Sequence, residues 1–248
     1  MSDRYFLYID ILGFADLVAT DPKKVDQLFG AVNQLTAHQH GDFQTVVFSD
    51  TILIFNKTAP VRKHDHQYLV MYAIEFAQDL QKWCIKLDIQ FRAVLVKGEF
   101  HYRKVENLEA YSGGALIKAY RKEKEINGIG LFIWKNIAHR NTIYKTVSFD
   151  QDLDFVFLTQ NLESVLFYTG GELPIHLAWI LESPSLPYLW LEVLLLKGLK
   201  RNMDRVVDSR VRAKYLQTYL IYRSRYPTIV AALEKQDFSL KALNSEVD

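Results

Sequence analysis

The pattern of hydrophobic and polar residues divides the first 160 positions into alternating strands and helices. Residues 5–12 form a dense apolar run of strand length, which is typical of a central strand covered on both faces. Further runs of apolar, β-branched and aromatic residues predict the remaining strands. These lie at residues 43–48, 51–55, 89–96, 99–102, 129–133, 142–149 and 155–158, with Gly98 expected to turn the chain between the fourth and fifth of the predicted strands.

Helical spacing fills the gaps between these strands. A short helix is expected over residues 14–18 after Gly13, and Asp21-Pro22 is a typical cap and first residue for the next helix. Apolar residues then recur at helical spacing on one stripe, at Val25, Leu28, Phe29, Val32 and Leu35. A long helix over residues 66–86 carries a second stripe, at Leu69, Ala73, Phe76, Leu80, Trp83 and Leu87, on which Trp83 and Cys84 are expected in the core. Ser112-Gly113-Gly114 opens a further helix that runs to about Glu125.

The resulting order, β-α-β-β-α-β, is that of the ferredoxin-like folds. We therefore predict an α+β fold: a ferredoxin-like βαββαβ palm with extra strands. From about residue 173 the pattern is helical only, and Pro184, Pro187 and Pro227 are expected to break it. The predicted domains are the α+β domain over residues 1–165 and a helical C-terminal extension over residues 166–248.

Two acidic residues stand at the edges of otherwise apolar strands. Asp10 lies near the end of the first strand, and Asp50 lies at the tip of the hairpin formed by residues 43–48 and 51–55. The predicted topology places the first strand beside this hairpin. A buried carboxylate without a partner is unfavourable, so two of them ending neighbouring strands predict a shared cation. Such a pair can hold two divalent ions about 3.5–4 Å apart, as in phosphoryl-transfer sites.

Composition narrows the possible partners. A net charge of +1 gives no overall attraction to nucleic acid or to an anionic membrane, and we expect neither as a partner. Cys84 is the only cysteine, which excludes an intrachain disulfide and a multi-cysteine zinc site. The N-terminus has no signal-peptide pattern, and the apolar run at residues 186–196 is too short to cross a bilayer. We expect a cytoplasmic protein.

The ordered motifs resemble those of the class III nucleotidyl cyclases. These motifs are Ile9-Asp10-Ile11-Leu12-Gly13-Phe14, Phe48-Ser49-Asp50, Phe91-Arg92 through Gly98-Glu99, and residues 113–121. Within that class the chain looks most like the pyrimidine cyclases of the bacterial Pycsar anti-phage systems, in which Ala-Tyr-x-x-Glu recurs, here as residues 119–123. The resemblance covers roughly residues 4–160.

The resemblance implies that UTP is converted to 3′,5′-cyclic UMP and pyrophosphate, as a signal to a separate cyclic-nucleotide-responsive effector. Asp10, Asp50 and the Ile11 carbonyl would hold two Mg²⁺ or Mn²⁺ ions. The turn Leu12-Gly13-Phe14 would offer backbone N–H groups to the β- and γ-phosphates.

Arg121 matches the family arginine that stabilises charge on the transferred phosphate. In the family it reaches across a head-to-tail dimer, so the resemblance implies a homodimer. The alternative interpretation is that Arg121 is one charge on a solvated helix face, among several lysines and glutamates.

The chain departs from the purine cyclases at the positions that contact ribose and base. Ile117 replaces an asparagine, and Val46 replaces the lysine that reads adenine. Ala110-Tyr111 lies at the other base-reading position, where Tyr111 could stack on a pyrimidine. This favours a pyrimidine over a purine and leaves CTP open as the alternative substrate to UTP. A nucleotidyltransferase that joins two nucleotides, and a non-catalytic nucleotide-binding relative, also remain open.

Overall fold

The computed structural model describes residues 3–35, 40–175 and 186–244. They form two compact units. The first comprises residues 1–126 and 130–158, and the second comprises residues 127–129 and 159–248. The domain boundary predicted at residues 165–166 falls inside a helix, α7 (Gln160–Thr169). The catalytic role assigned to the first part stays a prediction. Pro184, the expected helix breaker, lies outside the described residues.

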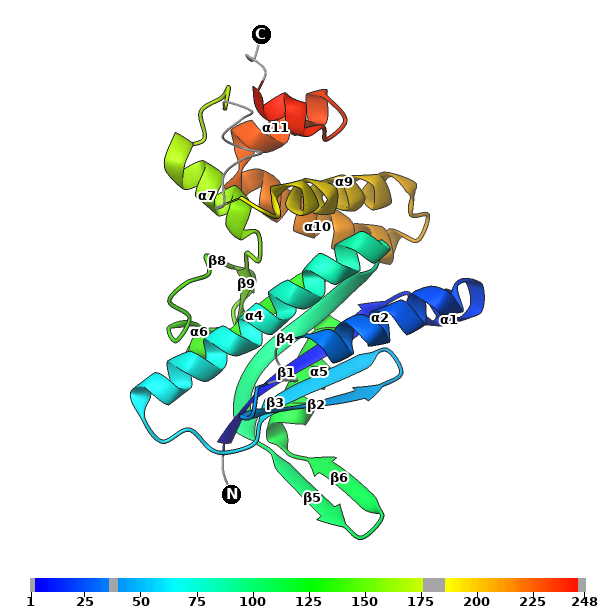
Figure 1. Cartoon of the computed structure of the whole chain (residues 1–248), viewed down its shortest axis with the longest axis vertical. Coiled ribbons are helices and arrows are strands. Elements are labelled where there is room, and N and C mark those ends of the chain that lie inside the picture. The colour runs from blue at the N-terminus through cyan, green and yellow to red at the C-terminus, as the bar shows by residue number, and fades with distance from the viewer. Residues whose placement is uncertain (1–2, 36–39, 176–185, 245–248) are drawn as a thin grey trace. The chain divides into compact units, whose positions relative to one another are not determined.

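The first unit is built on a seven-stranded sheet of order β2-β3-β1-β4-β7-β9-β8 (Figure 1). The strands are β1 (Asp3–Leu12), β2 (Phe43–Phe48), β3 (Thr51–Asn56), β4 (Gln90–Glu99), β7 (Gly130–Trp134), β8 (Thr146–Ser148) and β9 (Leu153–Val156). β1 pairs antiparallel with both β3 and β4. The predicted α+β fold with its central β-α-β-β-α-β order is confirmed.

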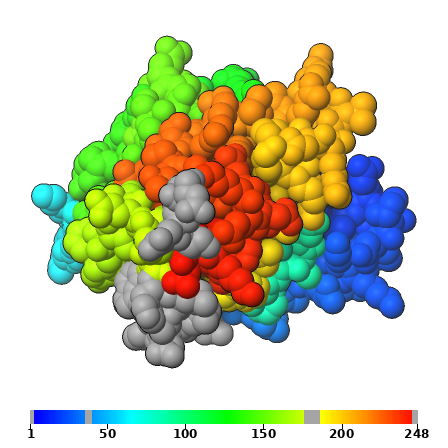
Figure 2. Space-filling view, turned by 90° about the horizontal axis from the view of Figure 1, so that it is seen from above, coloured from blue at the N-terminus to red at the C-terminus, as the bar shows by residue number. Residues whose placement is uncertain are grey.

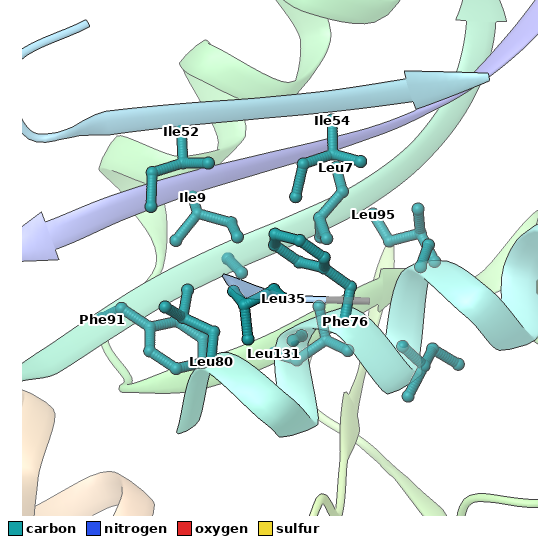
Figure 3. Packing of buried hydrophobic residues seen from close by; sticks show 14 of the residues in the cluster. Leu7, Ile9, Leu35, Ile52, Ile54, Phe76, Leu80, Phe91, Leu95 and Leu131 are labelled. Atoms are coloured by element: carbon teal, nitrogen blue, oxygen red, sulfur yellow. The ribbon is translucent and has the colours of Figure 1, made fainter. Parts of the chain in front are cut away.

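Alternation along β1 decides which helices cover each face of the sheet. Odd-numbered residues of β1 join the core formed with α2 (Pro22–Gln34) and α4 (Lys63–Leu87). Figure 3 shows Leu7 and Ile9 of β1 beside Ile52 and Ile54 of β3, facing Phe76 and Leu80 of α4. The opposite face packs against α5 (Gly114–Glu125) and carries Tyr8 and Asp10.

Local chemistry explains where two helices begin. The Asp21 carboxylate accepts a hydrogen bond from the Lys24 amide at 3.2 Å, and Pro22 is the first residue of α2, as predicted. Gly113 precedes α5 with a φ of 141°. A Cβ at this position would lie 2.4 Å from the Glu99 carbonyl oxygen, so only glycine allows α5 to start so close to β4.

Several local predictions differ from the structure. Gly98 does not turn the chain, because β4 continues through it to Glu99. The strand predicted at 99–102 is divided between the end of β4 and the start of β5 (His101–Val105), which forms a hairpin with β6 (Leu108–Ser112). Figure 1 shows this hairpin extending away from the sheet. Trp83 and Phe29 lie on helix stripes but are 36% and 37% exposed. The strand predicted over residues 142–149 shrinks to β8, because Asn141 binds the amides of Ile143 and Tyr144 in a turn.

The second unit is helical, as predicted for the C-terminal region. It contains α7, α9 (Leu189–Arg205), α10 (Ser209–Arg225), α11 (Pro227–Lys235) and the 3₁₀-helix η1 (Leu240–Asn244). The buried Glu192 carboxylate accepts hydrogen bonds from the amides of Asn161 and Leu162 at 3.0 and 2.7 Å, so α9 supplies the cap of α7. Figure 2 shows α11 and η1 (red) packed beside α10 (orange).

Two expectations from composition can be compared with this structure. Cys84 is buried, as expected, and burial raises the pKa of its thiol to about 12, so it is not a reactive thiolate at neutral pH. Among the described residues, no helix combines the length and the apolar character that spanning a membrane requires.

The small helix α6 (Lys135–Ala138) follows β7 directly, and α1 (Phe14–Thr20) follows β1. α1 therefore begins next to the end of β1 that carries Asp10.

Candidate active site

Strand pairing brings Asp10 and Asp50 to the same end of the sheet. Asp10 is directly opposite Thr51 of β3, and Asp50 precedes Thr51 in the turn between β2 and β3. The amide of Ile11 donates a 2.9 Å hydrogen bond to the Asp50 carbonyl, which fixes the hairpin turn to the end of β1. Ser49 allows this tight turn by adopting a φ of 56°.

The Tyr8 hydroxyl lies on the same face of the sheet as Asp10, and its pKa responds to the charges of Asp10 and Asp50. Its hydroxyl is 3.3 Å from Thr51 Oγ1, which in turn lies 3.4 Å from Asp50 Oδ1. Burial raises the pKa of the Tyr8 phenol, and the negative charges of Asp10 and Asp50 raise it further, against the hydrogen bond from Thr51. Both carboxylates therefore lie close to one hydroxyl on the α5 face of the sheet.

A buried arginine stands on the other side of Asp10. Arg92 is opposite Asp10 in the register of β1 and β4, and its Nη2 is 3.6 Å from Asp10 Oδ2. The same nitrogen donates to the Glu123 carboxylate of α5, and Nη1 donates to the Ile126 carbonyl at 2.9 Å. Burial lowers the pKa of the Arg92 guanidinium, and the Asp10 carboxylate opposes that effect. Arg92 thus links Asp10 to α5.

Sequence reasoning did not assign Arg92, Glu123 or Tyr8 to this site. Arg92 is only 5% exposed, so it is not an ordinary charge at a strand edge. Two signals could have found the pair. Arg92 interrupts an apolar run that continues to Val96, and Glu123 lies one helical turn after the buried Ala119.

A short helix follows Gly13 at the end of β1, as predicted. Gly13 adopts φ 71° and ψ 21°, in the left-handed region, and α1 starts at the next residue. Within the described residues, no side chain caps the first turn of α1. The side chains of Ile11 and Phe14 are buried and that of Leu12 is half-buried, so Gly13 exposes backbone at this turn. The predicted roles of Leu12, Gly13 and Phe14 toward phosphates, and of the Ile11 carbonyl toward a cation, stay predictions.

Arg121 and Tyr111 do not join the aspartates within one chain. Arg121 is exposed, and it follows the buried Ala119 by two residues, or about 200° around α5, so it faces away from the sheet. Tyr111 of β6 contacts Phe55, Phe100 and Tyr102. Phe55 is four residues from Thr51 along β3, which places Tyr111 roughly 13 Å along the strand from the Asp10 end.

The donor set fits hard divalent cations. The two carboxylates and a backbone carbonyl are oxygen ligands, which Mg²⁺ and Mn²⁺ prefer. Arg92 divides its positive charge between Asp10 and Glu123, so this one cation does not offset both Asp10 and Asp50. Among the described residues, no cluster of three or more His, Cys, Asp or Glu side chains could hold a metal ion. The neighbouring residues His64, Asp65 and His66 therefore do not form such a cluster.

Comparison with solved structures identifies the class that shares this fold. The chain is structurally similar to class III adenylyl and guanylyl cyclase domains. The guanylyl cyclase domain of the RhoGC fusion protein from the aquatic fungus Blastocladiella emersonii matches with a TM-score of 0.50 and 18% identity, over 63% of this chain and 95% of that chain. At this identity the match establishes the fold and nothing beyond it.

Two further matches have lower TM-scores. The adenylyl cyclase CyaB from P. aeruginosa matches with a TM-score of 0.47 and 12% identity, over 62% of this chain and 93% of that one. The guanylate cyclase domain of RhGC from Catenaria anguillulae, solved in complex with GTP, matches with a TM-score of 0.48 and 13% identity, over 62% and 96% of the two chains. No protein-family model and no curated protein sequence matches this chain.

The buried pair of Arg92 and Glu123 generates a prediction about stability. Replacing Arg92 by Met leaves Glu123 buried without its cation, and we expect this to lower the free energy of unfolding by about 3–5 kcal/mol. The double change Arg92→Met with Glu123→Met removes both charges and should cost clearly less than Arg92→Met alone. Guanidinium unfolding followed by circular dichroism measures both values.

The matched control is Lys23→Met on the exposed side of α2, which should change stability by no more than about 0.5 kcal/mol. An Arg92→Met variant as stable as this control would contradict the assigned role of the pair.

Proposed function

We propose that this protein is a pyrimidine nucleotide cyclase that converts UTP to 3′,5′-cyclic UMP and pyrophosphate. The observation that carries the proposal is the juxtaposition of Asp10 near the end of β1 and Asp50 in the β2–β3 turn, in a fold shared with a guanylyl cyclase domain. In the reaction a bond forms between the ribose 3′-oxygen and the α-phosphorus. The bond from that phosphorus to the pyrophosphate leaving group breaks, and the 3′-hydroxyl proton is released.

Asp10, Asp50 and the Ile11 carbonyl are the residues that would hold two Mg²⁺ or Mn²⁺ ions. Bound there, the metal supplies activation of the 3′-hydroxyl and neutralisation of the triphosphate. The chain itself contributes position and charge. Arg92 directs Oδ2 of Asp10 toward β4, and the turn at Gly13 with the first turn of α1 provides amides for the terminal phosphates.

The proposed homodimer would bring Arg121 and Tyr111 of one chain to the aspartates of the other. Arg121 is exposed and turned away from its own aspartates, and Tyr111 lies toward the far end of β1. Both positions fit a head-to-tail arrangement, in which Arg121 of one chain steadies the charge that develops on the phosphate bound by its partner. The exposed Arg121 is accordingly proposed as the transition-state group and Tyr111 as the platform for the base.

The choice of a pyrimidine depends on side chains that cannot read a purine. Val46 pairs with Leu53 in the β2–β3 register and offers no hydrogen bond, and Ile117 is 53% exposed on α5. Burial and the Glu109 carboxylate raise the pKa of the Tyr111 phenol to about 12, so the ring stays neutral for stacking at physiological pH. The same features suit CTP, and a cytidylate cyclase that forms cyclic CMP is the alternative.

The biological setting is proposed from the resemblance of the sequence motifs to the Pycsar pyrimidine cyclases. The cyclic nucleotide would signal in bacterial anti-phage defence by binding a separate cyclic-nucleotide-responsive effector. A nucleotidyltransferase that links two nucleotides uses similar metal chemistry, and a non-catalytic relative would bind nucleotide without turnover. Products therefore decide among these candidates.

The first prediction here concerns the product. Full-length protein incubated with Mn²⁺ and each of the four nucleoside triphosphates should form cyclic UMP and pyrophosphate from UTP, detected by chromatography and mass spectrometry. Asp50→Ala should abolish the product because it removes a proposed metal ligand. Asp26→Ala, an exposed acid on α2, is the matched control and should retain full activity. Cyclic CMP as the main product would select the alternative, whereas linked dinucleotides or no product from any triphosphate would contradict the cyclase proposal.

A second prediction tests the shared site. Asp10→Ala and Arg121→Ala should each be inactive alone, because each spoils both sites of a symmetric homodimer. After the two variants are mixed and allowed to exchange subunits, half of the dimers carry one intact site out of two. Activity should then return to about a quarter of the wild-type value.

Mixing two preparations of Asp10→Ala with different tags provides the control and should restore nothing. Failure of the complementary mixture, with exchange demonstrated by the tags, would mean that Arg121 does not act across a dimer.

A further inference from the structure

A hollow lies on the same face of the sheet as Asp10, toward the opposite end of β1. It has a volume of about 290 Å³, close to the lower limit of about 300 Å³ that is usual for small-molecule sites. Its lining comes from β1, from the outer hairpin of β2 and β3, and from the start of the β5–β6 hairpin. The lining residues are Arg4, Gln44, Phe55, Asn56, Lys57, Phe100 and Tyr102.

The hollow carries positive charge that the described residues do not neutralise. Arg4 and Lys57 line it, and neither forms an ion pair within the described part of the chain. The Arg4 Nη1 atom is buried and has no hydrogen-bond partner. An unpaired buried donor of this kind is unfavourable, and an anion bound in the hollow would satisfy it.

The nearby carboxylates are engaged elsewhere. Asp3, next to Arg4 in the chain, forms an ion pair with Lys97 at 3.2 Å. Glu109 accepts hydrogen bonds from Tyr102 and Tyr111 at 3.1 and 2.8 Å. Neither carboxylate forms an ion pair with Arg4 or Lys57, so both cations can bind a ligand, while Glu109 keeps its own negative charge beside Tyr102.

The other walls of the hollow are aromatic or amide groups. Phe100 packs against Phe55 with ring centroids 4.6 Å apart. Tyr102 is 41% exposed, and its ring lies nearly parallel to that of Tyr111 at 5.3 Å. Gln44 carries an amide beside them, with Nε2 3.5 Å from the Tyr111 hydroxyl. A flat ring can stack on such a wall while its anionic substituent meets the two cations.

From these contacts we infer that this hollow binds a small planar ligand, namely an aromatic or heteroaromatic ring that carries a phosphate group. Arg4 and Lys57 bind the phosphate, and Phe100 and Tyr102 hold the ring. Arg4 and Asp10 are six residues apart on β1, or roughly 20 Å, so this site is separate from the aspartates of the same chain, although its wall adjoins Tyr111. The inference does not depend on the cyclase proposal.

The test uses phenyl phosphate as the smallest probe that combines both features. It is titrated into the full-length protein by calorimetry in the presence of EDTA, which keeps divalent ions away from Asp10 and Asp50. Inorganic phosphate and phenol are the fragment controls. We expect phenyl phosphate to bind one site per chain, at least about tenfold more tightly than either fragment, because both halves of the ligand are recognised.

Variants assign the binding to the hollow. Arg4→Met and Lys57→Met should each weaken phenyl phosphate at least about tenfold, because each removes a charged hydrogen-bond donor. Lys23→Met removes the same charge from the other side of the sheet and should bind like the wild type. Circular dichroism checks that every variant is folded.

Three results would overturn the inference. They are no saturable binding of phenyl phosphate to the wild type, unchanged binding in both folded hollow variants, and loss of binding in Asp50→Asn, which would assign the ligand to the other site. Uridine 5′-monophosphate, tested in the same way, distinguishes a nucleotide ligand from a simpler aryl phosphate.

Discussion

The pairing of β1 with β3 on one side and β4 on the other is the constraint on which the rest of the structure depends. This register places Asp10 between Thr51 and Arg92 and ties the Asp50 turn to the end of β1. A slip of one residue would move Asp10 to the opposite face, into the core beneath α4. The apolar residues Leu7, Ile9 and Ile11 prevent that slip, because they must stay in that core.

The balance of charge at this end of the sheet follows from the same register. Two carboxylates and one arginine lie on the α5 face, and α5 adds the Glu123 carboxylate from above. Glu123 and the Ile126 carbonyl hold Arg92 from one side, so that it contacts Asp10 without fully neutralising the two aspartates. Together these groups leave negative charge for a divalent cation, while the buried arginine donates from Nη1 and Nη2 and its Nε has no hydrogen-bond partner among the described residues.

The fold was largely predictable because its main elements are long and strongly patterned. The apolar run of β1, the stripe of α4 and the Asp21-Pro22 start of α2 are each local signals, and their order defines the sheet topology. The position of Asp10 next to the Asp50 turn followed from that topology. What failed was decided by tertiary packing. Gly98 looked like a turn residue but is extended in β4, and Trp83 lies on an apolar stripe that is wider than the core it covers.

The contact between Arg92 and Glu123 could be predicted only in part, for a similar reason. The two residues are separated by 31 positions, and the local signal at each does not show that their side chains meet. Only the antiparallel packing of α5 on β4, with the start of α5 beside Gly98 and its end beside Arg92, brings them together. The pocket formed by Arg4 and Lys57 likewise requires the β5–β6 hairpin, which the sequence pattern did not indicate.

The central claim is that Asp10 and Asp50 together bind divalent cations. Electron paramagnetic resonance of Mn²⁺, with a non-hydrolysable α,β-methylene analogue of UTP present, measures this directly by counting free and bound ions. We predict that Mn²⁺ binds tightly to the wild-type protein and to Asp26→Asn. Its affinity should be at least about tenfold lower in both Asp10→Asn and Asp50→Asn. Equal Mn²⁺ affinity in all four proteins would contradict it.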